Sequence, residues 1–148
     1  MIQLEPYLNF MGETAEAMKF YQSVLGGELK MQTYGEVGQS KSPAEENLIM
    51  HAVLKNDVFE FMASDGNTEH PVKPGNNIQM SISGDDEAAL TKFFDGLSKE
   101  GTVDFPLAKQ FWGDMFGMVT DKFGVHWMVN ISSKEQAQAS PVSGTVAM

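Results

Sequence analysis

Apolar and polar positions alternate through FGVHWMVNIS, residues 123–132, and this alternation predicts a β-strand with one dry side. The apolar face consists of Val125, Trp127, Val129 and Ile131. The opposite face is mostly polar and consists of His126, Met128, Asn130 and Ser132. A histidine and an asparagine on an apparently central strand either face bulk water or line a pocket.

The same pattern, followed along the chain, predicts two successive units that each run strand, helix, strand, strand, strand. The first unit has a helix at 13–27 and strands at 2–10, 28–34, 48–54 and 58–64. The second has a helix at 85–101 and strands at 77–83, 102–108, 115–121 and 125–132. The helix segments EAMKFYQSVLGGEL and AALTKFFDGLSKEG share a skeleton. The chain therefore reads as a duplicated βαβββ unit of the α+β class.

These elements predict one domain over residues 1–132, with a first module at about 1–66 and a second at about 76–132. Residues 133–148 are small and polar and predict a loose C-terminal tail. Local signals support the element ends. Gly26 or Gly27 can end the first helix, and Asp85 or Asp86 can cap the second. The segment DKFG predicts a tight turn with Gly124 in a permissive conformation.

Composition narrows the possible functions. The 148 residues include no cysteine, which excludes disulfides, thiolate metal sites and cysteine nucleophiles. The net charge is -10, and all ten basic side chains are lysines. Nucleic-acid binding needs a basic surface, usually with arginine, so no nucleic-acid partner is expected. The N-terminus has no signal-peptide pattern, and no apolar stretch approaches the roughly 20 residues that span a bilayer. We expect a cytoplasmic protein without a membrane partner.

Four segments, in their order, resemble the vicinal oxygen chelate superfamily, which includes glyoxalase I, bleomycin-resistance proteins and extradiol dioxygenases. They are AMKFYQSVLGGEL, IMHAVL, FEFMASDG and FWGDMFGMVTDKFGVHWMVN. The resemblance extends from about Ile2 to Ile131 and is strongest to the PhnB-like branch. It implies that the two modules form a curved mixed sheet, shaped as a cup with helices outside, and that the protein is a homodimer. Part of this branch has carried a demethylubiquinone methyltransferase label, which no glycine-rich loop after a strand supports in this sequence.

Within such a cup, the polar sides of the strands would converge on a small-molecule ligand. The proposed catalytic residues are Glu60 and His51. The proposed substrate-binding residues are Glu5, Tyr7, Asn9, Met62, Asn77, Gln79, Trp112, His126, Met128 and Asn130. A flat sheet with one wet face would show the same alternation, and Trp112 could instead fill a dimer interface.

Metal-dependent members of the superfamily take ligands from the first, fourth, fifth and eighth strands. Aligned residue by residue, the resemblance places these positions at Glu5, Glu60, Asn77 and Met128. An asparagine is a weak neutral ligand, and a thioether binds hard divalent ions poorly. We therefore expect no metal site and no cofactor. A divalent ion would need His51 or His126 to join the two carboxylates.

Glu60 lies between Phe59 and Phe61, where desolvation would raise its pKa and suit it to general-base chemistry. Alternatively, it faces water or pairs with a lysine. His51 and His126 are either catalytic or hydrogen-bonded core residues. Two function classes follow. One is an enzyme that acts on a small organic molecule, and the other is a resistance-type protein that sequesters an apolar or cationic compound.

Overall fold

The computed structural model describes residues 1–67 and 69–133. The chain divides into two compact units, Met1–Lys73 and Pro74–Met148, here called module 1 and module 2. All but the first residue of the tail predicted at 133–148 lies outside the described residues. Within the described part, no helix is long and apolar enough to cross a bilayer.

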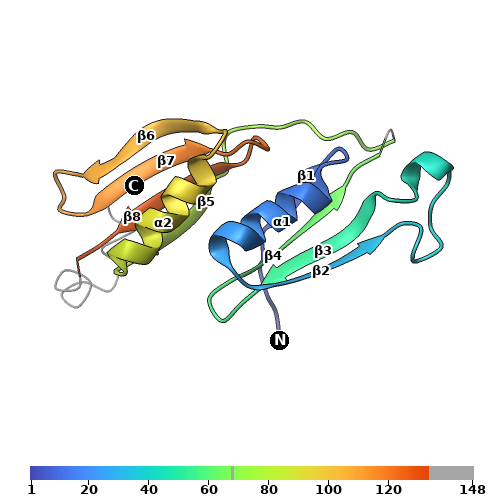
Figure 1. The fold of residues 1–148 in the computed structure, drawn as a ribbon, viewed down its shortest axis with the longest axis horizontal. Helices are drawn as coiled ribbons and strands as arrows, with labels where there is room; N and C mark the ends of the chain where they lie inside the picture. The colour runs from blue at the N-terminus through green and yellow to red at the C-terminus, as the bar shows by residue number, and fades with distance from the viewer. Residues whose placement is uncertain (68, 134–148) are drawn as a thin grey trace. The chain divides into compact units, whose positions relative to one another are not determined.

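Module 1 is a four-stranded mixed sheet with one helix on one of its faces (Figure 1). Its strands lie in the order β1-β4-β3-β2. Only the β1–β4 pair is parallel. The elements are β1 Tyr7–Phe10, α1 Thr14–Leu25, β2 Glu28–Thr33, a 3-10 turn Pro43–Glu45, β3 Ile49–Lys55 and β4 Glu60–Asp65.

Module 2 repeats this topology, with strand order β5-β8-β7-β6 and a parallel β5–β8 pair. Its elements are β5 Met80–Gly84, α2 Glu87–Ser98, β6 Thr102–Lys109, β7 Met115–Thr120 and β8 His126–Ile131. The predicted α+β class and the duplicated βαβββ unit are therefore confirmed. The arrangement of both sheets in one cup stays a prediction.

The core of each module lies between its helix and the facing side of its sheet. In module 1 this layer includes Met18 and Tyr21 of α1 against Ala52, Leu54 and Phe61 of the strands, all buried. In module 2 the corresponding buried layer consists of Leu90, Phe94, Leu97, Val119, Trp127 and Val129. The apolar half of each alternating strand thus packs under a helix, as the period-two pattern predicts.

Two predicted strands begin three or more residues later in the structure than in the sequence analysis. The strand predicted at 2–10 begins at Tyr7, because β1 pairs only with Met62–Asp65 of β4. Ile2 and Leu4 alternate correctly but are fully exposed. The strand predicted at 77–83 begins at Met80 and runs to Gly84. Alternation alone does not make a strand where no neighbouring strand supplies hydrogen bonds.

The first turn of α1 is held by a residue far away in the chain. The buried Asp65 carboxylate accepts hydrogen bonds from Gly12 N at 2.8 Å and from Thr14 N at 3.1 Å. It also accepts from Thr14 Oγ1 at 2.7 Å and from Ile49 N at 2.8 Å. Asp65 therefore ties α1, β3 and β4 together and satisfies N–H groups that the helix start leaves unpaired.

The first turn of α2 is held locally. Asp86 is the N-cap residue, and its Oδ1 accepts from Ala89 N at 3.1 Å. At the other end of α1, Gly26 takes a positive φ of 79°, as expected for a helix stop. The predictions for Asp86 and Gly26 are confirmed.

The β3–β4 and β7–β8 hairpins each turn on an amide or acidic side chain. In module 1, Asn56 Oδ1 accepts from Val58 N and Phe59 N. In module 2, Asp121 Oδ1 accepts from Phe123 N at 2.8 Å, and its Oδ2 accepts from Trp127 Nε1 at 2.8 Å. Gly124 in this turn has a φ of 87°, which confirms the predicted turn.

Candidate functional site

Each sheet has an open face, defined here as the side opposite to its helix. On the open face of module 1, β4 presents Glu60, Met62 and Ser64, and β3 presents His51 and Val53. Met62 lies beside Tyr7 of β1 and Val53 of β3 in the strand register. These side chains are half-buried or exposed, so the open face of module 1 is accessible within that module.

A carboxyl pair occupies one end of this face. A side-chain hydrogen bond between Glu5 and Glu60 raises the pKa of Glu5, and desolvation and the charge of Glu60 add to this rise. Lys55 acts in the opposite direction on the same pKa. The Lys55 Nζ lies 3.9 Å from Glu60 Oε1, and 26% of the Glu60 side chain is exposed. Glu60 is therefore part-buried and has a lysine beside it, which is the alternative that the sequence analysis left open.

Tyr7 and His51 lie beside one another on the same face. Their ring centroids are 6.1 Å apart in an edge-to-face arrangement. Asn9 is exposed on β1, two residues after Tyr7. The structure therefore brings Glu5, Glu60, Tyr7, His51 and Met62 onto one face of module 1. Asn9 lies on the same face, opposite Ser64 in the strand register.

The open face of module 2 carries a histidine with a defined partner. Thr120 Oγ1 donates to Asp104 Oδ2 at 2.6 Å and lies 2.9 Å from His126 Nδ1. Because the hydroxyl proton is directed to Asp104, His126 must donate from Nδ1. This leaves Nε2 of a neutral His126 ring as an acceptor. Next along β8, Met128 lies opposite Met118 of β7.

The segment before β5 contributes less than predicted. Asn77 and Gln79 are exposed and precede the first residue of the strand. Trp112 lies in the connection between β6 and β7, with its ring centroid 6.0 Å from that of Phe116. Asn130 is buried and hydrogen-bonded to Asp114, from Nδ2 to Oδ2 at 2.9 Å.

The internal symmetry of the modules gives a different set of matched positions from the one expected. Tyr7 pairs with Met62 in module 1, and Ser81 pairs with Met128 in module 2. Tyr7 is therefore equivalent to Ser81, and Met62 to Met128. Two residues earlier in each strand, Glu5 is equivalent to Gln79 and Glu60 to His126. Both positions in module 2 therefore shift by two residues from the expected Asn77 and Met128.

The residues of module 1 do not fit a resident divalent ion. The two carboxyls are hydrogen-bonded to one another, and the Lys55 ammonium stands beside Glu60. A bound cation would have to displace both interactions, and the face offers two oxygen ligands where such ions take four or more. Among residues 1–67 and 69–133, no three acidic or histidine side chains gather as metal ligands do.

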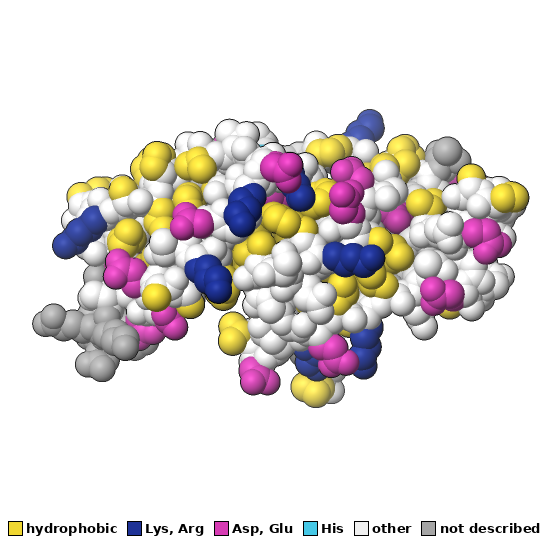
Figure 2. All heavy atoms as spheres, viewed as in Figure 1, with side chains coloured by type: hydrophobic (Ala, Val, Ile, Leu, Met, Phe, Trp, Pro, Cys, Tyr) yellow, Lys and Arg dark blue, Asp and Glu magenta, His cyan; other side chains and the backbone are white. Residues whose placement is uncertain are grey.

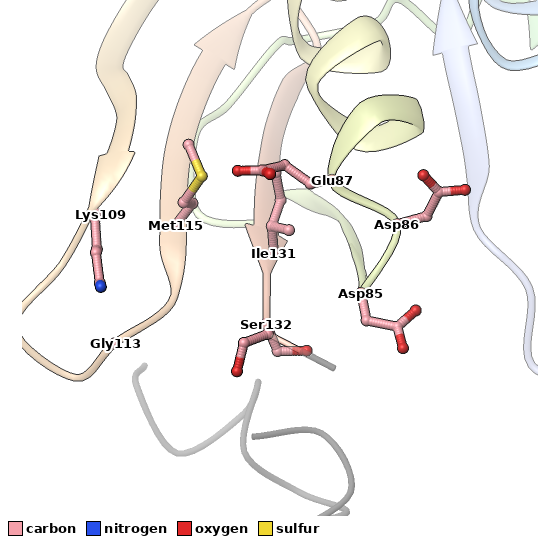
Figure 3. Close-up of a pocket in the computed structure, with 9 residues that line it drawn as sticks. Asp85, Asp86, Glu87, Lys109, Gly113, Met115, Ile131 and Ser132 are labelled. Atoms are coloured by element: carbon pink, nitrogen blue, oxygen red, sulfur yellow. The ribbon is translucent and has the colours of Figure 1, made fainter. Parts of the chain in front are cut away.

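A pocket of about 670 Å³ lies in module 2, around the start of α2 and the end of β8. None of the predicted site residues lines it. It is lined by Asp85, Asp86, Glu87, Lys109, Gly113, Met115, Ile131, Ser132 and Ser133. In Figure 3 the carboxylates of Asp85 and Asp86 point away from Lys109, so the charged groups do not converge on one point. Asp86 is already engaged as the cap of α2.

The surface charge gives no sign of a nucleic-acid interface. On the face drawn in Figure 2, acidic and lysine side chains are interspersed with apolar ones. With Asp+Glu at 20 against ten lysines, the excess charge is acidic. A cationic or neutral ligand fits this surface better than an anion does.

Four residues of these faces were missed by the sequence analysis, namely Lys55, Asp114, Phe116 and Thr120. Phe116 and Thr120 alternate with the apolar side of β7, and this period could have revealed them. Asp114 was hidden because it follows Gly113 in a segment typical of a turn.

Comparison with known proteins identifies the family. Residues 3–130 match the protein family described as 3-demethylubiquinone-9 3-methyltransferase. Protein YjdN of Escherichia coli K12 is 31% identical over 146 residues, which cover 91% of this chain and 99% of YjdN.

Two solved structures are similar over their whole length. Protein PA1353 from Pseudomonas aeruginosa is 38% identical with a TM-score of 0.79, covering 90% of this chain and 100% of that one. A Bacillus cereus PhnB protein, described as a putative 3-demethylubiquinone-9 3-methyltransferase, is 25% identical with a TM-score of 0.75, covering 88% of this chain and 100% of that one.

The fold extends to more distant proteins. A glyoxalase/bleomycin resistance protein/dioxygenase family enzyme from Burkholderia phytofirmans shares it at 14% identity and a TM-score of 0.57, covering 84% of this chain and 95% of that one. The resemblance inferred from the sequence motifs is confirmed. The chain belongs to the PhnB-like family described as 3-demethylubiquinone-9 3-methyltransferase, and it shares its fold with a glyoxalase/bleomycin resistance protein/dioxygenase family enzyme.

Proposed function

We propose that this protein binds a small organic molecule on the open face of module 1 and exchanges a proton with it through Glu5 and Glu60. The observation that carries the proposal is the hydrogen-bonded carboxyl pair with a raised pKa on Glu5. Such a pair holds one proton more readily than two separate carboxylates do, so it offers an acid and a base side by side.

The surroundings of the pair suit an organic ligand. Met62 and Tyr7 supply apolar contact next to the carboxyls, and the His51 ring stands against Tyr7. A methionine adapts its shape to different ligands. No methyl transfer is proposed, because the strand-to-helix connections at Met11–Glu13 and Asp85–Asp86 lack a glycine-rich loop for a nucleotide-like methyl donor.

Sequestration without chemistry is the second candidate. It is favoured by the Lys55–Glu60 contact of 3.9 Å, which partly neutralises the carboxylate that a general base would need. Under this alternative, the acidic and aromatic open face holds a cationic or apolar compound and leaves it unchanged.

The experiment compares the wild-type protein with Glu60→Gln and with Glu16→Gln, an exposed helix position with the same charge change. A library of small amines, ketones and phenols is screened by thermal shift, and each hit is then followed by proton NMR for turnover. We expect hits that Glu60→Gln weakens about tenfold or more and Glu16→Gln leaves unchanged.

Turnover lost in Glu60→Gln supports the acid–base function, and binding without turnover supports sequestration. Equal binding by all three proteins would contradict both. The proposal also uses no metal, so one equivalent of zinc, nickel or iron that survives dialysis and is lost in Glu60→Gln would contradict it as well.

We further propose that the protein is a homodimer. Strands β1 and β5 each have a single neighbour in their own sheet, which leaves an edge that can pair with a second chain. Sedimentation equilibrium at micromolar concentration should give twice the chain mass, and a monomer would count against the proposal.

A further inference from the structure

A buried polar pair, Asp114 and Asn130, lies at the open face of module 2. Asp114 lies in the bend just before β7, and its hydrogen bond to Asn130 places it beside the open face. Asn130 of β8 lies directly opposite Phe116 in the register. Asp114 is 0% exposed and Asn130 is 5% exposed.

The hydrogen bonding of this pair is half complete. Asn130 Nδ2 donates to Asp114 Oδ2 at 2.9 Å. Among the described residues, no donor reaches Asp114 Oδ1 or Asn130 Oδ1, although both atoms are buried. No lysine of the described chain forms an ion pair with Asp114. Two buried acceptors without donors are costly, and the cost rises when one is a carboxylate.

Aromatic rings surround the strand end that carries the pair. The Phe116 ring lies 5.8 Å from Phe105 and 6.0 Å from Trp112, and both contacts are edge-to-face. Ring faces attract cations, and a carboxylate within such a group strengthens that attraction. The face therefore offers negative charge, two hydrogen-bond acceptors, ring surface and the buried indole N–H of Trp112.

We propose that Asp114 and Asn130 form a subsite for an organic ammonium ion, with Phe116 and Trp112 as its aromatic walls. A primary ammonium carries three N–H donors and a positive charge, which matches the two unpaired oxygens and the carboxylate. A carboxylate or phosphate ligand would meet like charge, and a neutral apolar ligand would leave both oxygens unpaired.

Entry to the subsite requires a local movement, because Asp114 has no exposed surface. We place this movement in the turn before it, at residues 110–113. Gly113 takes a φ of 102°, and Phe111 is 97% exposed beside Trp112, at a ring distance of 4.9 Å. The turn is held to the strand by the bond from Gln110 N to Asp114 O at 2.8 Å. Trp112 therefore reports on the movement.

This inference goes beyond the proposed function, because it uses residues of module 2 only. The two can therefore fail separately. Failure of the Glu60-dependent hits leaves this inference intact if benzylammonium still shifts the Trp112 signal and Asp114→Asn weakens that binding.

The test follows the indole N–H signal of Trp112 by NMR in the wild-type protein, with Trp112→Phe to assign the signal. Benzylammonium is the probe, and benzyl alcohol and benzoate are its neutral and anionic controls at neutral pH. We expect benzylammonium to shift the Trp112 signal saturably, with benzyl alcohol at least about tenfold weaker and benzoate without effect.

Two variants locate the site. Asp114→Asn should weaken benzylammonium about tenfold or more, whereas Asp85→Asn, with the same charge change in the pocket of Figure 3, should bind like the wild type. Equal binding of the alcohol and the ammonium would indicate a site for water or any small polar group and would overturn the proposal. Absence of binding up to the solubility limit, or unchanged binding in Asp114→Asn, would overturn it too. If Asp114→Asn fails to fold, the comparison of benzylammonium, benzyl alcohol and benzoate on the wild-type protein still tests the proposal.

Discussion

The two modules share a topology but secure the start of their helices in opposite ways. In module 1, four donors from two distant segments converge on the Asp65 carboxylate. In module 2, Ile131 occupies the position that matches Asp65, and the cap comes from Asp86 within the helix itself. The backbone arrangement is thus duplicated, while the polar interactions that hold it are not.

The open faces differ even more. The strand registers match Glu60 with His126 and Lys55 with Thr120. Module 1 therefore has an acid beside a lysine where module 2 has a histidine beside a threonine. Most helix-facing strand positions, Asp65 excepted, stay apolar in both modules because they form the core. Open-face positions carry no such packing requirement, so their chemistry can diverge within one fold.

The largest expected effect tests the difference between the two caps. Asp65→Ala should lower the free energy of unfolding by about 3 to 5 kcal/mol, because several buried donors lose a charged acceptor at once. Asp86→Ala should cost about 1 kcal/mol, as N-cap removal usually does. Urea denaturation of both variants measures the two losses in the free energy of unfolding.

Asp95→Ala, an exposed acid on α2, is the control and should stay within about 0.5 kcal/mol of the wild type. Equal losses in Asp65→Ala and Asp86→Ala would show that the long-range bonds of Asp65 add nothing beyond an ordinary cap.

A smaller effect should separate the helix–sheet packing of the modules. Gly117 of β7 matches Ala52 of β3, but a Cβ at Gly117 would lie 2.6 Å from Phe94 Cε2 and 2.9 Å from Leu107 Cα. Gly117→Ala should therefore cost about 1 to 3 kcal/mol through overpacking. Gly75→Ala has open space, with the nearest atom at 3.8 Å, and serves as the control. Thermal unfolding measures the stability of both variants. If Gly117→Ala is as stable as the wild type, α2 can shift on its sheet to make room for the added methyl group.

The smallest effect concerns pH. The pKa of Glu5 is raised above its ordinary 4.5, so the folded protein binds this proton more tightly than the unfolded chain does. The resulting stabilisation is fully present below pH 4.5 and is lost as the pH rises through the folded value. Relative to Glu5→Gln, the wild type should therefore lose stability on going from acid to neutral pH. Urea denaturation across this range checks the sign, and parallel curves for the two proteins would refute it.

The architecture could be predicted from the sequence, because the alternation of apolar and polar residues shows which side of a strand is buried. The sequence located the face of Glu60, His126 and Asn130 for the same reason. Alternation says nothing about which residues lie opposite each other, so the Lys55–Glu60 contact and the Asp114–Asn130 bond emerged only from the strand registers. The two-residue offset at Asn77 has the same origin, since β5 begins at Met80 and its register is set by β8.

The long reach of Asp65 also bears on the order in which the chain folds. Its partners Gly12 and Thr14 lie 53 and 51 residues upstream. During synthesis, the first turn of α1 leaves the ribosome well before the carboxylate that completes it, whereas Asp86 and Ala89 emerge almost together. Closing the longer loop costs more chain entropy and takes longer. The nascent α1 should therefore stay frayed until β4 has docked, while α2 can close its first turn as soon as it is made.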